Sequence, residues 1–164
     1  MKMNRTVHAA ERRVLKLVPT PWNVEEFARR VAETRNKPVR IVDLDFSPQG
    51  GITGAWKPTS KQDIIFVSSS AAGLRRDAII CHELAHMTLG HTPSELGFTG
   101  SAAVQDIAPL LLEASPALAS KFMFRHDYDS QAESDAEHLA TVVIAAISAV
   151  PANRTAHHVA KSLL

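Results

Sequence analysis

The chain is 164 residues long, 45% apolar and 21% charged, which suits one globular domain with a hydrophobic core and excludes a largely disordered chain. Eighteen Lys and Arg against 17 Asp and Glu leave a formal net charge of +1, so no basic field is broad enough to hold a nucleic-acid backbone. Cys81 is the single cysteine, which excludes an internal disulfide framework and suits a reducing compartment.

The first half of the chain predicts two helices followed by three strands. A loose helical pattern covers residues 1–18 and stops at Pro19. Asn23 with Glu26 three residues later forms a capping box for a second helix, which we expect to run to about Arg35. The strands are expected at residues 39–44, 52–56 and 63–67, with a turn at 48–51, and together they predict a small, mostly antiparallel three-stranded sheet.

A third helix follows these strands. The three serines at 68–70 offer N-caps, and Gly90 offers a C-terminal cap. Ile80, Leu84 and Met87 form an apolar stripe along this helix at positions i, i+4 and i+7, which predicts that it packs beneath the sheet.

Helical patterns also fill most of the C-terminal half. Residues 101–124 are expected to be helical with a break near Pro116, and a last long helix is expected to start after Asp129 and to end at about Val150. The fold class is therefore predicted as α+β, in one domain over residues 1–164. Within it, residues 1–22 form an N-terminal helical extension and residues 23–150 form the core.

The third helix carries the H-E-x-x-H pattern as His82, Glu83 and His86. Two histidines four residues apart face the same side of a helix, so both imidazoles can bind one metal ion. The carboxylate of Glu83 is rotated by about 100° from His82, close enough to reach a water on that metal. The pattern therefore predicts a zinc site with Glu83 as the catalytic group.

A catalytic zinc ion usually takes three protein ligands, so one is missing from this pattern. A common solution is a Glu on a second, downstream helix, and Glu133 fits it. Glu137 lies on the same helix face and can accept the free ring N–H of a ligand histidine. His91 is interpreted as a residue favoured by the dipole at the helix C-terminus, with a place at the rim of the site as the alternative. The other candidates for the third ligand are Asp127, Asp129, Asp135 and Glu137 itself.

Five segments carry a recognisable set of motifs: D-I-I-F-V at 63–67, R-R-D-A-I-I-C at 75–81, H-E-L-A-H at 82–86, G-H at 90–91 and E-S-D-A-E-H-L-A at 133–140. Together they resemble the ImmA/IrrE family of small prokaryotic metallopeptidases. The resemblance covers roughly residues 24–144. It implies a zincin-type active-site helix with a thermolysin-like zinc site, and proteolysis of a regulatory protein, commonly a helix-turn-helix repressor encoded nearby.

Charge on a tetrahedral transition state needs a stabilising group besides the metal. Tyr128 and His126 precede the Glu133 segment, and His138 lies within it, so these three are the candidates. Cys81 points about 100° away from His82 and is interpreted as a small buried residue.

The sequence thus predicts a Zn²⁺-dependent endopeptidase that cleaves a specific regulatory protein. The alternative is a non-catalytic, zinc-containing binding module that acts as a regulator or toxin–antitoxin partner. The N-terminal residues do not read as a secretion signal, and the longest apolar run, 139–150, is too short to cross a bilayer. We therefore expect a cytoplasmic protein that binds neither membranes nor nucleic acid directly.

Overall fold

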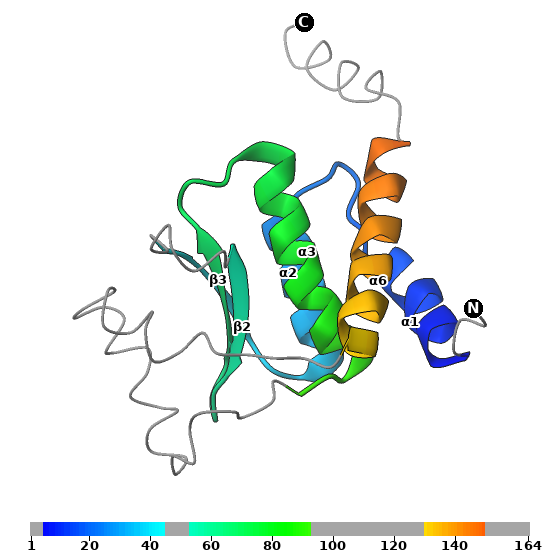
Figure 1. Ribbon diagram of the computed structural model, residues 1–164, viewed down its shortest axis with the longest axis horizontal. Helices are drawn as coiled ribbons and strands as arrows, with labels where there is room; N and C mark the ends of the chain where they lie inside the picture. Colours follow the sequence, from blue (N-terminus) through cyan, green and yellow to red (C-terminus); the bar gives the residue numbers. More distant parts are fainter. Residues whose placement is uncertain (1–4, 45–52, 93–129, 150–164) are drawn as a thin grey trace, which may run out of the picture.

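A computed structural model describes residues 5–44, 53–92 and 130–149, and it confirms the α+β class (Figure 1). Within these ranges four helices accompany one three-stranded sheet. In chain order the elements are α1 (Arg5–Leu15), α2 (Val24–Arg35), β1 (Val39–Leu44), β2 (Gly54–Pro58), β3 (Asp63–Ser68), α3 (Gly73–Leu89) and α6 (Ser130–Ser148).

The sheet is mixed, so the prediction of a mostly antiparallel sheet was wrong. Its strand order is β1-β3-β2, with β3 parallel to β1 and antiparallel to β2. β1 and β2 run in opposite directions, but β3 lies between these two strands instead of extending a meander. All six residues of β3 are buried, as expected for the central strand of the sheet.

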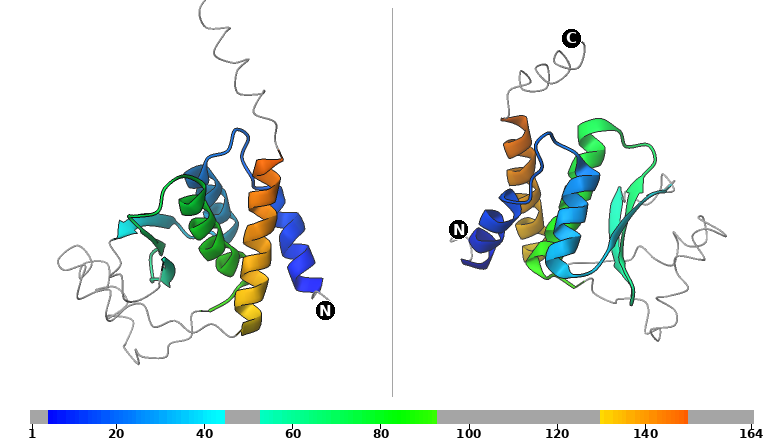
Figure 2. Two further views of the ribbon diagram at one scale, coloured as in Figure 1. Left: turned by 45° about the horizontal axis from the view of Figure 1, so that its top comes forward. Right: turned by 180° about the vertical axis from the view of Figure 1, so that it is seen from behind.

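The elements are stacked in three layers. The sheet covers one side of α2 and α3, while α6 and α1 cover the other side (Figures 1 and 2). The predicted stripe on α3 is confirmed, because Ile80, Leu84 and Met87 are each almost fully buried. Because α3 lies between the sheet and α6, residues on different faces of this one helix meet different partners.

The caps of α2 and α3 show where local sequence signals held and where they failed. Asn23 caps α2, since its Oδ1 accepts the backbone N–H of Glu26 at 2.7 Å. The serine cap predicted for α3 was wrong. Ser68 ends β3 and its hydroxyl bonds that of Ser70, while α3 begins after Ala72, which provides no side-chain cap. Ser68 therefore belongs to the sheet, and α3 starts at Gly73, three residues after Ser70.

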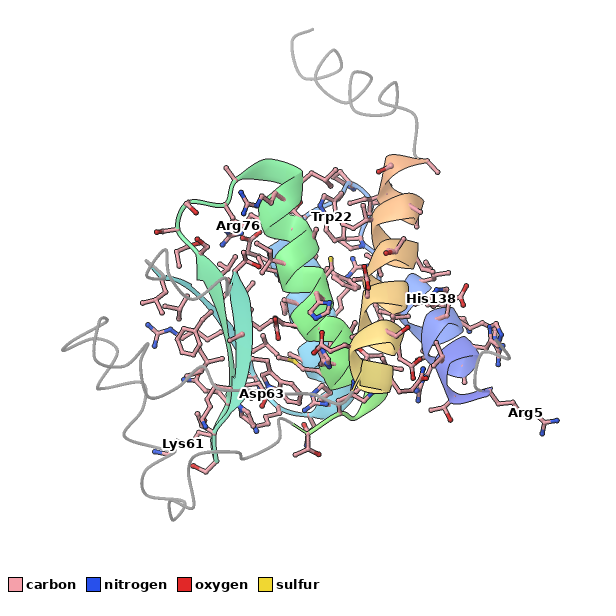
Figure 3. The ribbon with its side chains drawn as sticks, viewed as in Figure 1. Arg5, Trp22, Lys61, Asp63, Arg76 and His138 are labelled. Atoms are coloured by element: carbon pink, nitrogen blue, oxygen red, sulfur yellow. The ribbon has the colours of Figure 1, made fainter. Side chains whose placement is uncertain are left out.

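A buried ion cluster joins the sheet to the C-terminal end of α3 (Figure 3). Asp63, at the start of β3, is fully buried and pairs with Arg35 at 3.1 Å and with Lys37 at 2.9 Å. Arg35 also donates to the carbonyl of Met87 at 2.6 Å and stacks on the ring of Trp56. One side chain thus connects α2, α3, β2 and β3.

Some sequence predictions fall outside the described ranges. They include the turn at 48–51 and the helix at 101–124. The last predicted helix is confirmed as α6, and within the described residues none of the helices has the length and apolarity needed to cross a membrane.

Candidate metal centre

The two histidines of the motif lie on the face of α3 that packs against α6. His86 is completely buried, whereas the side chain of His82, one turn earlier, is 30% exposed. Their Nε2 atoms are 3.1 Å apart. The helix period therefore directs both imidazoles to one point, which opens to solvent on the His82 side.

Glu133 reaches this point from the first turn of α6. The buried face of α6 is made by Ala136, Leu139, Ala140 and Val143, and small residues on it let α6 approach α3 closely. Glu133 precedes Ala136 by three residues and therefore lies near the edge of that face, above the histidines. Its carboxylate oxygens are each 3.4 Å from an imidazole, Oε2 from His82 Nε2 and Oε1 from His86 Nε2.

The group His82, His86 and Glu133 can hold a metal ion, because one ligand atom from each lies within 4.8 Å of the others. Zinc–ligand bonds of about 2.0–2.2 Å in a tetrahedron place the ligand atoms about 3.4 Å apart. The measured separations of 3.1, 3.4 and 3.4 Å match that spacing. The donor set of two imidazoles and one carboxylate is also one that zinc accepts, so these residues fit a zinc ion.

Electrostatics keep His86 in the form that a metal requires. Burial, together with the neighbouring His82 and His91, lowers the pKa of His86 to about 3. The ring is therefore neutral at physiological pH, and a neutral imidazole has a lone pair to donate.

Glu83 lies on the side of α3 that meets β2 and is almost completely buried. Burial and, to a smaller extent, the charge of Glu133 raise the pKa of its carboxyl to about 8, against the opposing effect of a hydrogen bond from the backbone of Trp56. A β-carbon at Gly54 would come within 2.3 Å of Ile79 and 3.3 Å of a Glu83 oxygen. The strand thus approaches Glu83 closely only because residue 54 is glycine.

The sequence predicted that Glu137 accepts the free ring N–H of a ligand histidine, but the structure does not place it there. Glu137 is exposed on α6, and the Nδ1 of His86 instead lies 2.9 Å from the Nδ1 of His91. His91 therefore lies at the site, which agrees with the alternative interpretation of this residue. Its signal in the sequence was its place directly after the capping Gly90.

His138 is not brought to the site. It lies on the side of α6 that faces α1, with its Nε2 3.7 Å from a carboxylate oxygen of Glu11 (Figure 3). Asp135 is half-buried and accepts a hydrogen bond from Gln131. Cys81 is buried, as predicted, and burial raises the pKa of its thiol to about 12. Tyr128, His126, Asp127 and Asp129 lie outside the described residues.

Comparison of the chain with protein-family models, with curated proteins and with solved structures found no match. The resemblance to ImmA/IrrE peptidases therefore rests on the motifs alone and stays a prediction. What the geometry itself defines is an α+β protein with a candidate metal centre between α3 and α6.

Proposed function

We propose that this protein is a zinc-dependent endopeptidase. One observation carries the proposal. Glu83 is a buried carboxyl group outside the three-residue metal group, and it lies close enough to Glu133 for the charge of Glu133 to raise its pKa. A metal site that only stabilises a fold has no use for such a group and usually closes its fourth position with a protein ligand. A carboxyl placed beside the ligands instead suits a general base.

The roles of the residues follow from their places. His82, His86 and Glu133 would hold the zinc ion, which when bound acidifies water and polarises a carbonyl group. Glu83 accepts a proton from the attacking water and delivers it to the departing amine nitrogen. Burial raises the pKa of the Glu83 carboxyl, which favours its uptake of a proton from water.

The proposed substrate is an extended segment of a specific cytoplasmic protein. Among the described strands β2 lies at an edge of the sheet, and it lies next to Glu83. An extended peptide can add to such an edge through its backbone. The motif resemblance supports a helix-turn-helix repressor as the protein that is cut.

The test compares wild type, Glu83→Gln and Glu137→Gln, each loaded with zinc, on helix-turn-helix proteins encoded beside this gene. Products are mapped by mass spectrometry. Glu83→Gln preserves shape but removes the base, so we expect it to bind zinc and to cut at least about 100-fold more slowly. Glu137→Gln, the same chemical change at an exposed position on α6, should cut at the wild-type rate.

Two results would contradict the proposal. Equal cleavage by wild type and Glu83→Gln would remove Glu83 from the reaction. A stable complex without cleavage, the same for all three chains, would favour the non-catalytic binding module.

A further inference from the structure

The C-terminal end of α3 has a geometry that folds His91 back onto His86. Gly90 adopts a left-handed conformation with φ of 74° and ψ of 22°. The backbone N–H of His91 donates to the carbonyl of His86 at 3.0 Å, and that of Gly90 donates to the carbonyl of Met87 at 3.2 Å. This pair of bonds defines a Schellman motif, in which the residue after the glycine typically contacts the residue four before the glycine.

In most such motifs that contact is apolar, but here it joins two imidazoles. The Nδ1 atoms of His86 and His91 are 2.9 Å apart, which is hydrogen-bond distance. Only one proton can lie between two nitrogens at this distance. The question is which ring carries it.

The other ring nitrogen of His86, Nε2, determines which ring carries the proton. This atom faces His82 and Glu133, so metal binding requires a lone pair on Nε2. A neutral imidazole with a lone pair on Nε2 carries its proton on Nδ1. His86 must then be the donor and His91 the acceptor, with the proton of His91 on its own Nε2.

We propose that His91 is a positioning residue that accepts the Nδ1–H of His86 and so fixes the tautomer and the ring rotation of this metal ligand. The proposal rests on the metal site of the proposed function. Ligand histidines usually donate their second ring N–H to a carboxylate, a carbonyl or water. Here a second histidine takes that place, supplied by the turn that ends the metal-binding helix.

The same contact has an alternative proton arrangement with a different consequence. If His91 donated to His86, the proton of His86 would move to Nε2 and block the metal. His91 would then be a residue of the helix terminus, and its replacement would leave metal affinity unchanged or improve it.

Two nearly isosteric substitutions separate these cases. Asn in His91→Asn places an acceptor oxygen close to the position of Nδ1, whereas Leu in His91→Leu has the same shape and no acceptor. Zn²⁺ and Co²⁺ affinities are measured by competition with a chromogenic chelator, and the Co²⁺ absorption bands report the ligand geometry. We expect His91→Leu to bind about 10–100-fold more weakly and His91→Asn to stay within about threefold of wild type.

The tautomer is measured separately in the zinc-loaded wild type, by the ¹⁵N chemical shifts of the His86 and His91 rings, and needs no variant. A protonated Nδ1 on His86 is expected. An unprotonated Nδ1 on His86, equal losses in the Asn and Leu variants, or wild-type affinity in His91→Leu would each overturn the proposal. A wild-type chain that binds no Zn²⁺ at all would instead reject the metal site itself, which keeps the two failures distinct.

Discussion

Two clusters of charged or titratable side chains meet α3, and they differ in how their charges are balanced. At the C-terminal end of the helix, the buried carboxylate of Asp63 is matched by Arg35 and Lys37. We call these three residues the Asp63 cluster. On the α6 side, the metal group of His82, His86 and Glu133 brings two imidazoles to one carboxylate.

The metal group contains no permanent cation of its own. Within residues 5–44, 53–92 and 130–149, the ion pairs of Glu133 are with the two imidazoles, and the second carboxyl group nearby, Glu83, adds further negative charge when it ionises. Burial also disfavours the positive form of His86. In the Asp63 cluster the chain itself supplies two cations to the buried carboxylate, whereas the metal group gathers acceptors that an external cation would satisfy.

The largest expected effect of this difference is a pH dependence of the metal-free protein. The folded pKa of Glu83 is about 8 against an ordinary 4.5, so between these values the unfolded chain ionises while the folded one keeps its proton. The free energy of unfolding should therefore be highest below pH 4.5 for this group and fall as the pH rises to about 8. His86 has the opposite effect, because its pKa is lowered from 6.5 to about 3 in the folded protein. Its contribution to the free energy of unfolding should fall as the pH drops from 6.5 to about 3.

Glu83→Gln isolates the alkaline part of this profile. In the presence of a chelator, the variant should gain stability relative to wild type between pH 4.5 and 8.5, on the order of 3 kcal/mol. Urea unfolding at both pH values measures it. If the free energy of unfolding changed with pH in the same way for both chains, Glu83 would ionise in the folded protein without a cost in stability. That result would contradict the view that the metal group lacks a cation.

A somewhat smaller effect is expected at the Asp63 cluster. Asp63→Asn keeps the shape but leaves Arg35 and Lys37 without their counter-charge, which should cost about 2 kcal/mol of stability. Asp43→Asn is the matched control, because Asp43 is 55% exposed and its pair with Arg76 should contribute less than about 1 kcal/mol.

Asp63→Asn also tests whether the Asp63 cluster and the metal group are independent. At one fixed excess of free Zn²⁺, Asp63→Asn and wild type should be stabilised by the same increment, since that increment is set by the Zn²⁺ concentration and the affinity. Unequal increments, measured by thermal unfolding with and without Zn²⁺, would mean that the Asp63 cluster is coupled to the metal group.

The smallest effect concerns the two glycines at the ends of α3. Both Gly73 and Gly90 have positive φ, and a β-carbon on either would meet no atom within 4 Å. Substitution by Ala should therefore cost each variant about 1 kcal/mol through backbone strain alone. Only Gly90→Ala should also weaken Zn²⁺ binding, because Gly90 shapes the turn that holds His91 against His86. Equal Zn²⁺ affinities in the two variants would contradict that role.

Local patterns predicted the elements that bring the site together. The period of α3 directed His82 and His86 to one face, and the early position of Glu133 in α6 directed it to the same place. Both predictions depend on a single helix period and on an interface made of small residues. The bounds of α2 and α6 were predicted closely, whereas the start of α3 was not.

What the sequence failed to predict depends on contacts between distant segments. The parallel pairing of β1 with β3 follows from the insertion of a fully buried strand between two others, and the sequence of each strand does not say which strand it will pair with. Burial of Asp63 depends on Arg35 arriving from α2. The place of His91 was open to prediction, because a histidine, three residues, a glycine and a histidine match the spacing of a Schellman contact.

The most direct test of the account is the zinc content and affinity of wild type, Glu133→Gln and Glu137→Gln. The two substitutions are chemically identical and lie one turn apart on α6, but only the first removes a proposed ligand. We predict one Zn²⁺ per wild-type chain, an affinity unchanged in Glu137→Gln, and an affinity at least about 100-fold weaker in Glu133→Gln. Equal affinities in all three chains, or a wild type that binds no Zn²⁺, would contradict the metal site between α3 and α6.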